Sequence, residues 1–190
     1  MTRLSPLDIN TADQPTRTTL KAIETKLGML PNLLATMAHS PATLNGYLAL
    51  SNTLAQGSLT ARQRELIAIA VAQENGCEYC LSAHAAAASS LGIDAAAIAR
   101  ARAGFSEDAL DSAMLAFAVA VVKENGVLND QQIEAARQQG LSNGRILEVV
   151  TNVALNILTN YINLIADTEI DFPQLSLWDA DPDAALTAAS

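Results

Sequence analysis

Four side chains in one stretch of the 190-residue chain have types and spacing suited to thiol chemistry. Cys77 and Cys80 are the only two cysteines, two residues lie between them, and His84 follows Cys80 by four positions. Glu65 stands twelve positions before Cys77. Cysteines three apart in a first helical turn can form a disulfide. A histidine four residues further lies on the same helix face, where its imidazole can exchange protons with a thiol.

Two predicted helices must position these side chains. Thr60 and Gln63 fit a capping box, which predicts a helix over residues 60–73. Gly76 separates it from a second helix over residues 77–91, which Gly92 ends. Cys77 then lies at a helix N-terminus, where unpaired backbone N–H groups and the helix dipole favour a thiolate.

The geometry expected at the turn brings Glu65 to the histidine. If the chain folds back at residues 75–76, Glu65 comes to lie opposite position 87, about one helical turn from His84. Glu65 stands on a largely apolar helix, where a carboxylate is either exposed on the one polar edge or buried with a partner. A lone glutamate favours the exposed edge, but the neighbouring cysteine–histidine motif leads us to expect a buried, paired Glu65. The hairpin thus predicts a proton relay that runs from Glu65 through His84 to Cys80.

The remaining sequence predicts helices only. Half of the residues are hydrophobic but only 4% are aromatic, a composition that favours closely packed helices over a sheet. We expect an N-terminal arm over residues 1–15, a helical domain over 16–170 and a C-terminal tail over 171–190 that covers a neighbouring surface or is partly disordered. The other predicted helices span residues 16–27, 31–37, 41–56, 94–102, 106–124, 129–139 and 142–167.

The pattern Glu-x11-Cys-x2-Cys-x3-His between two alanine-rich helices resembles the alkylhydroperoxidase AhpD-like / carboxymuconolactone decarboxylase-like family. The resemblance extends upstream through residues 28–32, 39–41 and 59–65 and downstream to the helix over 148–163, so it covers roughly residues 20–165. It implies an all-α, AhpD-like helical fold with a CxxC-bearing helical hairpin at its core. It also implies a homo-oligomer, a trimer or a hexamer.

The resemblance further implies a peroxiredoxin-type oxidoreductase that acts on a hydroperoxide. Cys80 would attack the peroxide, Cys77 would resolve the sulfenic acid into a Cys77–Cys80 disulfide, His84 would carry the proton and Glu65 would orient His84. Helix electrostatics alone favour Cys77 as the more acidic thiol. No bound cofactor or metal is expected; an external dithiol, such as a lipoyl or thioredoxin-like protein, would reduce the disulfide.

Three alternatives stay open. A lyase of the carboxymuconolactone decarboxylase type would use Glu65 and His84 as acid and base, with the cysteines incidental. A non-enzymatic, redox-sensing oligomer would form the disulfide without turnover. A zinc site would need Cys77, Cys80 and His84 with Glu65 or His39 as fourth ligand, but this spacing is unusual for zinc.

Other features bear on function less directly. The net charge of −9 disfavours nucleic acid and anionic membranes, and the absence of an apolar leader predicts a cytoplasmic protein. His39 precedes a Ser-Pro cap and is interpreted as a surface residue. Tyr79 stands where the best-known family members have a histidine, which predicts weaker peroxidase activity or a different oxidant. A polar stripe at helical spacing is interpreted first as a helix–helix or subunit contact and second as part of the site; it comprises Asn152, Asn156, Asn160 and Asn163.

Overall fold

The structure is a computed structural model that describes residues 2–178. Within this range the chain forms nine α-helices and no strand, which confirms the predicted all-α class. The helices are α1 (Gln14–Leu27), α2 (Asn32–Met37), α3 (Pro41–Leu54), α4 (Ala61–Glu74), α5 (Glu78–Ser90), α6 (Ala95–Arg102), α7 (Ala109–Lys123), α8 (Asp130–Gln138) and α9 (Asn143–Ala166).

Local sequence signals set most of the helix ends. The predicted capping box is present: the Thr60 hydroxyl accepts from the Gln63 N–H at 3.2 Å, and the Gln63 side chain accepts from the Thr60 N–H at 3.0 Å. The helix expected over residues 16–27 begins two residues earlier, at Gln14, inside the predicted N-terminal arm, because the Asp13 carboxylate caps it by accepting from the Thr16 N–H at 2.9 Å. The helix expected over residues 41–56 ends at Leu54. The start of α7 also differs from the prediction. Helix α7 was expected to begin at Ser106, but the Asp108 carboxylate caps it by accepting from the Asp111 N–H at 2.9 Å. A carboxylate is the stronger acceptor at the positive end of a helix.

Helix α4 lies at the centre of the fold. Seven consecutive residues of α4, from Leu66 to Ala72, are buried, and the helix packs against α5, α6, α7 and α9. A helix that is apolar on all sides in this way has no face left for solvent. Helices α4 and α5 form the predicted hairpin, with Gly76 in a left-handed conformation (φ 66°) at the turn between them.

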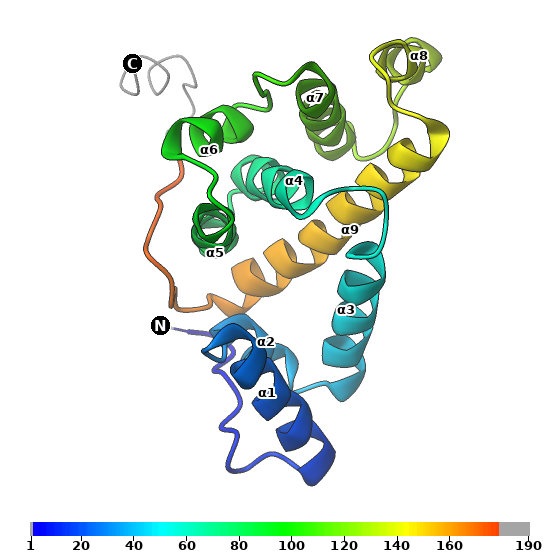
Figure 1. The fold of residues 1–190 in the computed structure, drawn as a ribbon. Coiled ribbons are helices and arrows are strands. Elements are labelled where there is room, and N and C mark those ends of the chain that lie inside the picture. Colours follow the sequence, from blue (N-terminus) through cyan, green and yellow to red (C-terminus); the bar gives the residue numbers. More distant parts are fainter. Residues whose placement is uncertain (1, 179–190) are drawn as a thin grey trace.

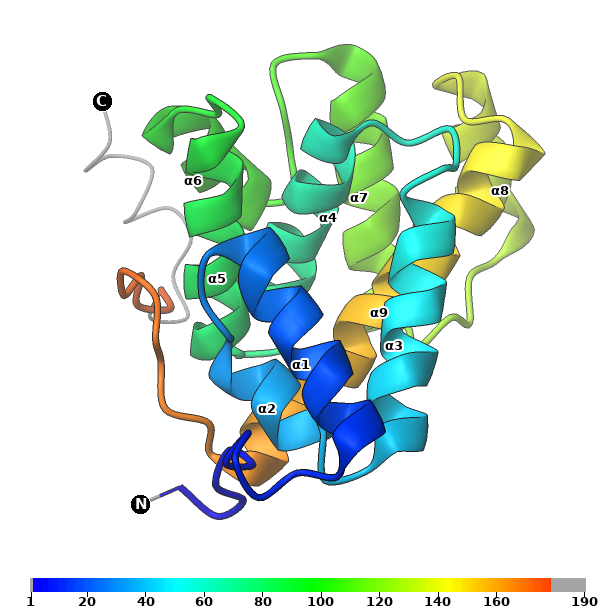
Figure 2. The same ribbon diagram turned by 60° about the horizontal axis from the view of Figure 1, so that its bottom comes forward.

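Helix α9 crosses the molecule diagonally. Helices α1–α3 lie on one side of it and α4–α7 on the other, and the second view shows α3 in front of it (Figures 1 and 2). It contacts α2, α3, α4, α5 and α7. By length and composition alone α9 could also cross a membrane, a test that the core helix of a soluble protein passes as well.

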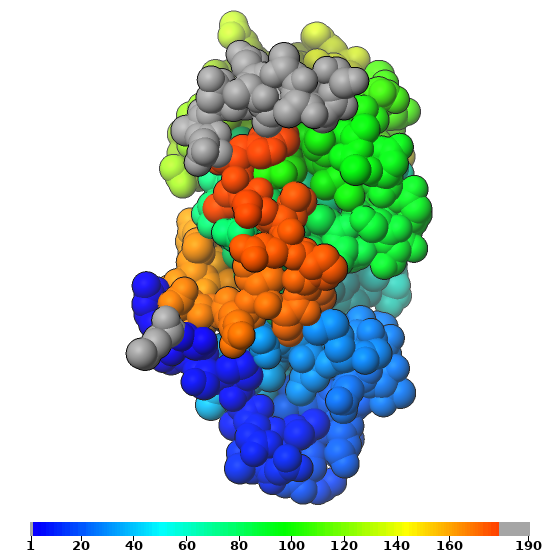
Figure 3. All heavy atoms as spheres, turned by 90° about the vertical axis from the view of Figure 1, so that its left-hand side faces the viewer, coloured from blue at the N-terminus to red at the C-terminus, as the bar shows by residue number. Residues whose placement is uncertain are grey.

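Both ends of the described chain pack against the helices. Before α1, the Leu7 N–H donates to the Ala35 carbonyl at 3.1 Å. After α9, residues 168–178 form a strap that runs over the face made by α5 and α6, drawn orange to red in Figure 3. The Leu175 N–H donates to the Ser82 hydroxyl of α5 at 3.0 Å, and Arg102 of α6 donates to the Ser176 carbonyl at 2.8 Å. The tail thus covers a neighbouring surface as far as residue 178; residues 179–190 lie outside the described part.

Candidate active site

The two cysteines lie together at the start of α5. Cys77 is the N-cap residue, its sulfur accepts from the Cys80 N–H at 3.3 Å, and the two sulfurs are joined in a disulfide with a Cα–Cα distance of 5.4 Å. Cys77 and Cys80 are 1% and 2% exposed. The sequence prediction that these sulfurs can join is therefore met, and the N-cap position of Cys77 agrees with the expectation from helix electrostatics.

The predicted contact between Glu65 and His84 is present. His84 Nδ1 lies 2.8 Å from Glu65 Oε2, and the two side chains are 27% and 24% exposed. Glu65 is thus partly buried and paired, as expected, rather than alone on an exposed edge. A carboxylate only accepts hydrogen bonds, so this geometry places the proton of a neutral imidazole on Nδ1 and leaves Nε2 as the base.

A small apolar cavity of about 130 Å³ lies beside Cys80. Cys80 and His84 line it from α5, whereas Cys77 does not. Three aromatic rings complete its wall together with aliphatic side chains; the lining comprises Leu27, Pro31, Leu33, Leu34, Tyr47, Tyr79, Cys80, Ala83, His84, Thr159 and Phe172. The cavity therefore distinguishes the two sulfurs: a small molecule bound in it meets Cys80.

A second, more polar cavity of about 200 Å³ lies on the other side of His84. Tyr47, His84 and Thr159 line both cavities, whereas Glu65 lines only the second. Burial, followed by the negative charge of Glu65, raises the pKa of Tyr47. The imidazole thus stands in the wall between the space beside the thiol and a polar space that contains its carboxylate partner.

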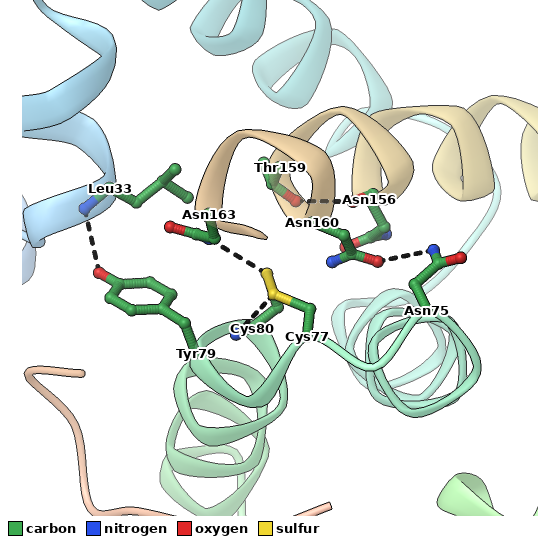
Figure 4. The surroundings of a disulfide bond; sticks show 9 residues. All are labelled: Leu33, Asn75, Cys77, Tyr79, Cys80, Asn156, Thr159, Asn160 and Asn163. Atoms are coloured by element: carbon green, nitrogen blue, oxygen red, sulfur yellow. Dashed lines mark hydrogen bonds between the residues drawn. A yellow bond between two sulfur atoms is a disulfide. The ribbon is translucent and has the colours of Figure 1, made fainter. Parts of the chain in front are cut away.

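The asparagine stripe of α9 faces the hairpin inside the chain (Figure 4). Asn163 Nδ2 donates to Cys80 Sγ at 3.2 Å, and Asn160 Oδ1 accepts from the side chain of Asn75, the C-cap residue of α4, at 2.8 Å. Asn152 and Asn156 donate to the backbone of their own helix and line the polar cavity. The stripe is a helix–helix contact, as interpreted first, but Asn163 also belongs to the site, a role that the sequence interpretation ranked second.

Tyr79 points away from the sulfurs. Its hydroxyl accepts from the Leu33 N–H at 3.1 Å (Figure 4). Its ring meets Phe172 of the strap edge to face at 5.7 Å, and burial raises its pKa. In this chain the residue between the cysteines joins α5 to α2 and the strap. It is therefore not placed to act as a proton carrier.

The remaining candidates are apart from this site. His39 is exposed, and its Nε2 lies 2.9 Å from the Ser5 carbonyl oxygen, in agreement with its interpretation as a surface residue. Among residues 2–178, no three His, Cys, Asp or Glu side chains are grouped so that they could hold a metal ion.

Comparison with known proteins agrees with this geometry. Residues 41–124, the segment that carries all four candidate side chains, match the model of the Carboxymuconolactone decarboxylase family. An uncharacterized protein of Haemophilus influenzae is 52% identical over 46 residues, which are 24% of this chain and 41% of that protein. The match thus spans about two fifths of the length of this curated relative.

Solved structures extend the likeness to nearly the whole chain. An alkylhydroperoxidase AhpD core, peroxidase-related protein of Ralstonia eutropha has a TM-score of 0.81 at 23% identity, covering 90% of this chain and 92% of its own. A peroxidase-related protein of Silicibacter has a TM-score of 0.76 at 27% identity, covering 87% and 91%. The debrominase Bmp8, solved as a cysteine-to-alanine variant with 2,3,4-tribromopyrrole, has a TM-score of 0.75 at 22% identity, covering 100% and 98%.

Residues 41–124 are therefore similar to the carboxymuconolactone decarboxylase family, and the chain as a whole has the AhpD-like fold. This confirms the resemblance predicted from the sequence. Sequence reasoning did not single out Tyr47, Thr159 or Phe172, which complete the cavity wall. No local pattern marks these three, because they reach the site from α3, α9 and the strap.

Proposed function

We propose that the protein is a thiol-dependent peroxidase. The Cys80 thiolate attacks the O–O bond of a hydroperoxide and becomes a sulfenic acid, while the alkoxide leaving group takes a proton to become an alcohol. The Cys77 thiol then condenses with the sulfenic acid, which forms the Cys77–Cys80 disulfide and releases water. An external dithiol reduces the disulfide and is itself oxidised.

One observation carries this assignment. Cys80 and His84 line the same apolar cavity, and Cys77 lies behind Cys80 within disulfide reach. The cavity beside Cys80 supports its assignment as the attacking thiol, and the disulfide partner behind it supports the assignment of Cys77 as the resolving thiol. Glu65 holds His84 by Nδ1, so that Nε2 can take the thiol proton and return it to the leaving oxygen.

The test is a thiol titration after reduction and removal of the reductant. One equivalent of cumene hydroperoxide should remove two thiols from the wild type. In Cys77→Ser it should remove one thiol and leave a sulfenic acid on Cys80 that dimedone traps. His84→Ala should slow the reaction, and His39→Ala is its matched control. Wild-type protein that keeps both thiols under excess peroxide would refute the proposal.

The reductant is a proposal of its own. Both sulfurs are buried, so a small or extended dithiol is better suited than a broad protein surface, and a lipoyl group has this shape. We expect hydroperoxide turnover with dihydrolipoamide as the reductant. Turnover rates measured in parallel with dihydrolipoamide and with a thioredoxin distinguish the two sources of electrons. A disulfide that must be reduced in every cycle fits a reducing compartment, so we propose the cytoplasm as the location. Disulfide formation without turnover in excess dithiol would instead indicate a redox sensor.

A second use of the same thiol pair is reductive dehalogenation. Three aromatic rings, Tyr47, Tyr79 and Phe172, line the cavity beside Cys80 and suit a small flat ring. In this reaction the thiolate takes the halogen, the aromatic carbon takes a proton, and the second thiol displaces halide to form the disulfide. Bromide release from 2,3,4-tribromopyrrole, with peroxide consumption measured in parallel, decides between the two substrates.

A lyase is the third candidate, and the polar cavity beside Glu65 and His84 is the observation that favours it. Such chemistry would use the carboxylate and imidazole as acid and base. Cys80→Ser distinguishes it, because peroxide or bromide turnover should vanish whereas lyase activity should survive.

A further inference from the structure

The outer face of α9 carries a continuous apolar row. Opposite the asparagine stripe, this outer seam repeats with the seven-residue period of a helix pair: Leu147, Ala154 and Tyr161 are one series, and Thr151, Leu158 and Ile165 are the other. All six are exposed except the partly exposed Thr151, and Leu147 and Ile165 are 67% and 64% exposed. Surface helices of globular proteins ordinarily carry charged side chains on this face.

The outer seam carries no charge of its own. Between Leu147 and Ile165 the only Asp, Glu, Lys, Arg or His is Glu148, whose carboxylate turns to the α3–α4 loop and accepts from the Ser58 N–H at 2.8 Å. The Leu59 N–H also donates to this carboxylate, at 3.2 Å. The hydrogen bonds from Ser58 and, to a smaller extent, from Leu59 lower the pKa of Glu148. Glu148 is therefore held away from the seam, and the α9 surface remains apolar over roughly 27 Å of helix.

The residues along the outer seam are complementary to a second copy that runs in the opposite direction. With the twofold axis at position 156, Tyr161 faces Thr151 of the other copy, so a large side chain meets a small one. Leu158 likewise faces Ala154, and Leu147 faces Ile165.

The ends of the helix are complementary in charge in the same register. Arg145 precedes the seam, and the acidic residues Asp167 and Glu169 follow it. An antiparallel pair therefore brings the basic end of one helix to the acidic end and the negative dipole end of the other. A parallel pair would instead place like charges side by side.

We infer that two copies of this chain associate through the outer seam of α9 as an antiparallel, twofold-symmetric helix pair. Such a contact uses the same surface patch on both copies, so two copies complete it and no further copy can add to the same patch. Of the trimer and hexamer expected from the family resemblance, it is compatible with the hexamer only. This inference is independent of the proposed chemistry, because the seam faces away from the cysteines.

The first experiment measures the assembly of the full-length protein by sedimentation equilibrium. Wild type should be a dimer or an even multiple. Leu158→Glu places two carboxylates beside the twofold axis and should raise the dimer dissociation constant at least tenfold, with unchanged circular dichroism. Val127→Glu, at an 80% exposed apolar residue between α7 and α8, is the matched control and should leave assembly unchanged.

The second experiment tests the register. Leu147→Glu and Ile165→Lys should each weaken association, whereas the double variant should associate more tightly than either, because each glutamate then faces a lysine of the other copy. The two positions are 18 residues apart, too far for an ion pair within one helix. A monomeric or trimeric wild type, binding of the wild-type monomer to anionic phosphatidylserine vesicles, or failure of the double variant to recover would overturn the inference.

Discussion

The hydrogen bond from Asn163 to Cys80 gives a direct test of how the fold prepares the thiol. The amide Nδ2 lies 3.2 Å from the sulfur, and Asn163 is buried, so water does not replace this donor when it is removed. A hydrogen bond to a charged group contributes about 1.5–3 kcal/mol. Sulfur is a weaker acceptor than oxygen, so the lower end applies. In Asn163→Leu the thiolate fraction of Cys80 at pH 7 should therefore fall about tenfold.

The observed rate should change less than this fraction. A thiolate that is less stabilised is also more nucleophilic, with a Brønsted coefficient of about 0.4–0.5, which offsets a tenfold loss of thiolate by roughly threefold. Asn163→Leu should thus react about threefold more slowly at pH 7 and about threefold faster at a pH high enough to ionise the thiol fully in both proteins. The two pH–rate profiles should cross.

The assay is iodoacetamide alkylation as a function of pH in the Cys77→Ser background, which leaves one thiol and keeps a good N-cap residue on α5. Asn156→Leu is the matched control, because this buried asparagine of α9 donates only to the Asn152 carbonyl. Superimposable profiles for the Asn163 variant and its parent would refute the role of the donor. Equal changes in the Asn156 control would show that the effect is one of packing.

Three further predictions concern stability and selectivity. Backbone hydrogen bonds, of which that from Ser58 has the largest effect, hold the pKa of Glu148 below its ordinary 4.5. The ionised Glu148 therefore stabilises the folded protein at neutral pH, and this stabilisation is lost as the pH falls through the lowered pKa. The difference in Tm between wild type and Glu148→Gln should shrink below pH 4.5 and vanish in stronger acid. Phe172→Ala removes the ring that meets Tyr79 beside the cavity and should raise the rate with cumene hydroperoxide relative to tert-butyl hydroperoxide; an unchanged ratio would show that the strap does not limit substrate size. Leu115→Ala, in the core of α7, should lower the free energy of unfolding by about 2–5 kcal/mol in urea titrations without changing the rate of thiol oxidation in the folded protein.

The predictable part of the site lies within one hairpin. The distance from Cys80 to His84 follows from helix geometry once both residues are on one helix, and Thr60 and Gly76 mark where the two helices begin and turn. The fold-back then brings Glu65 to His84 without further information. The structure bears out each of these steps, including the hydrogen bond between Glu65 and His84.

The sequence by itself determined the helices, their caps and the four side chains of the hairpin, because capping and i, i+4 spacing act within a few residues. Only the tertiary structure decided which sulfur faces a cavity and which donor meets it. Cys80 and Asn163 are 83 positions apart, and their contact depends on how far α9 is rotated about its own axis. The same rotation turns the asparagines inward and the apolar seam outward. It is fixed by packing among five other helices, which no local pattern in the chain specifies.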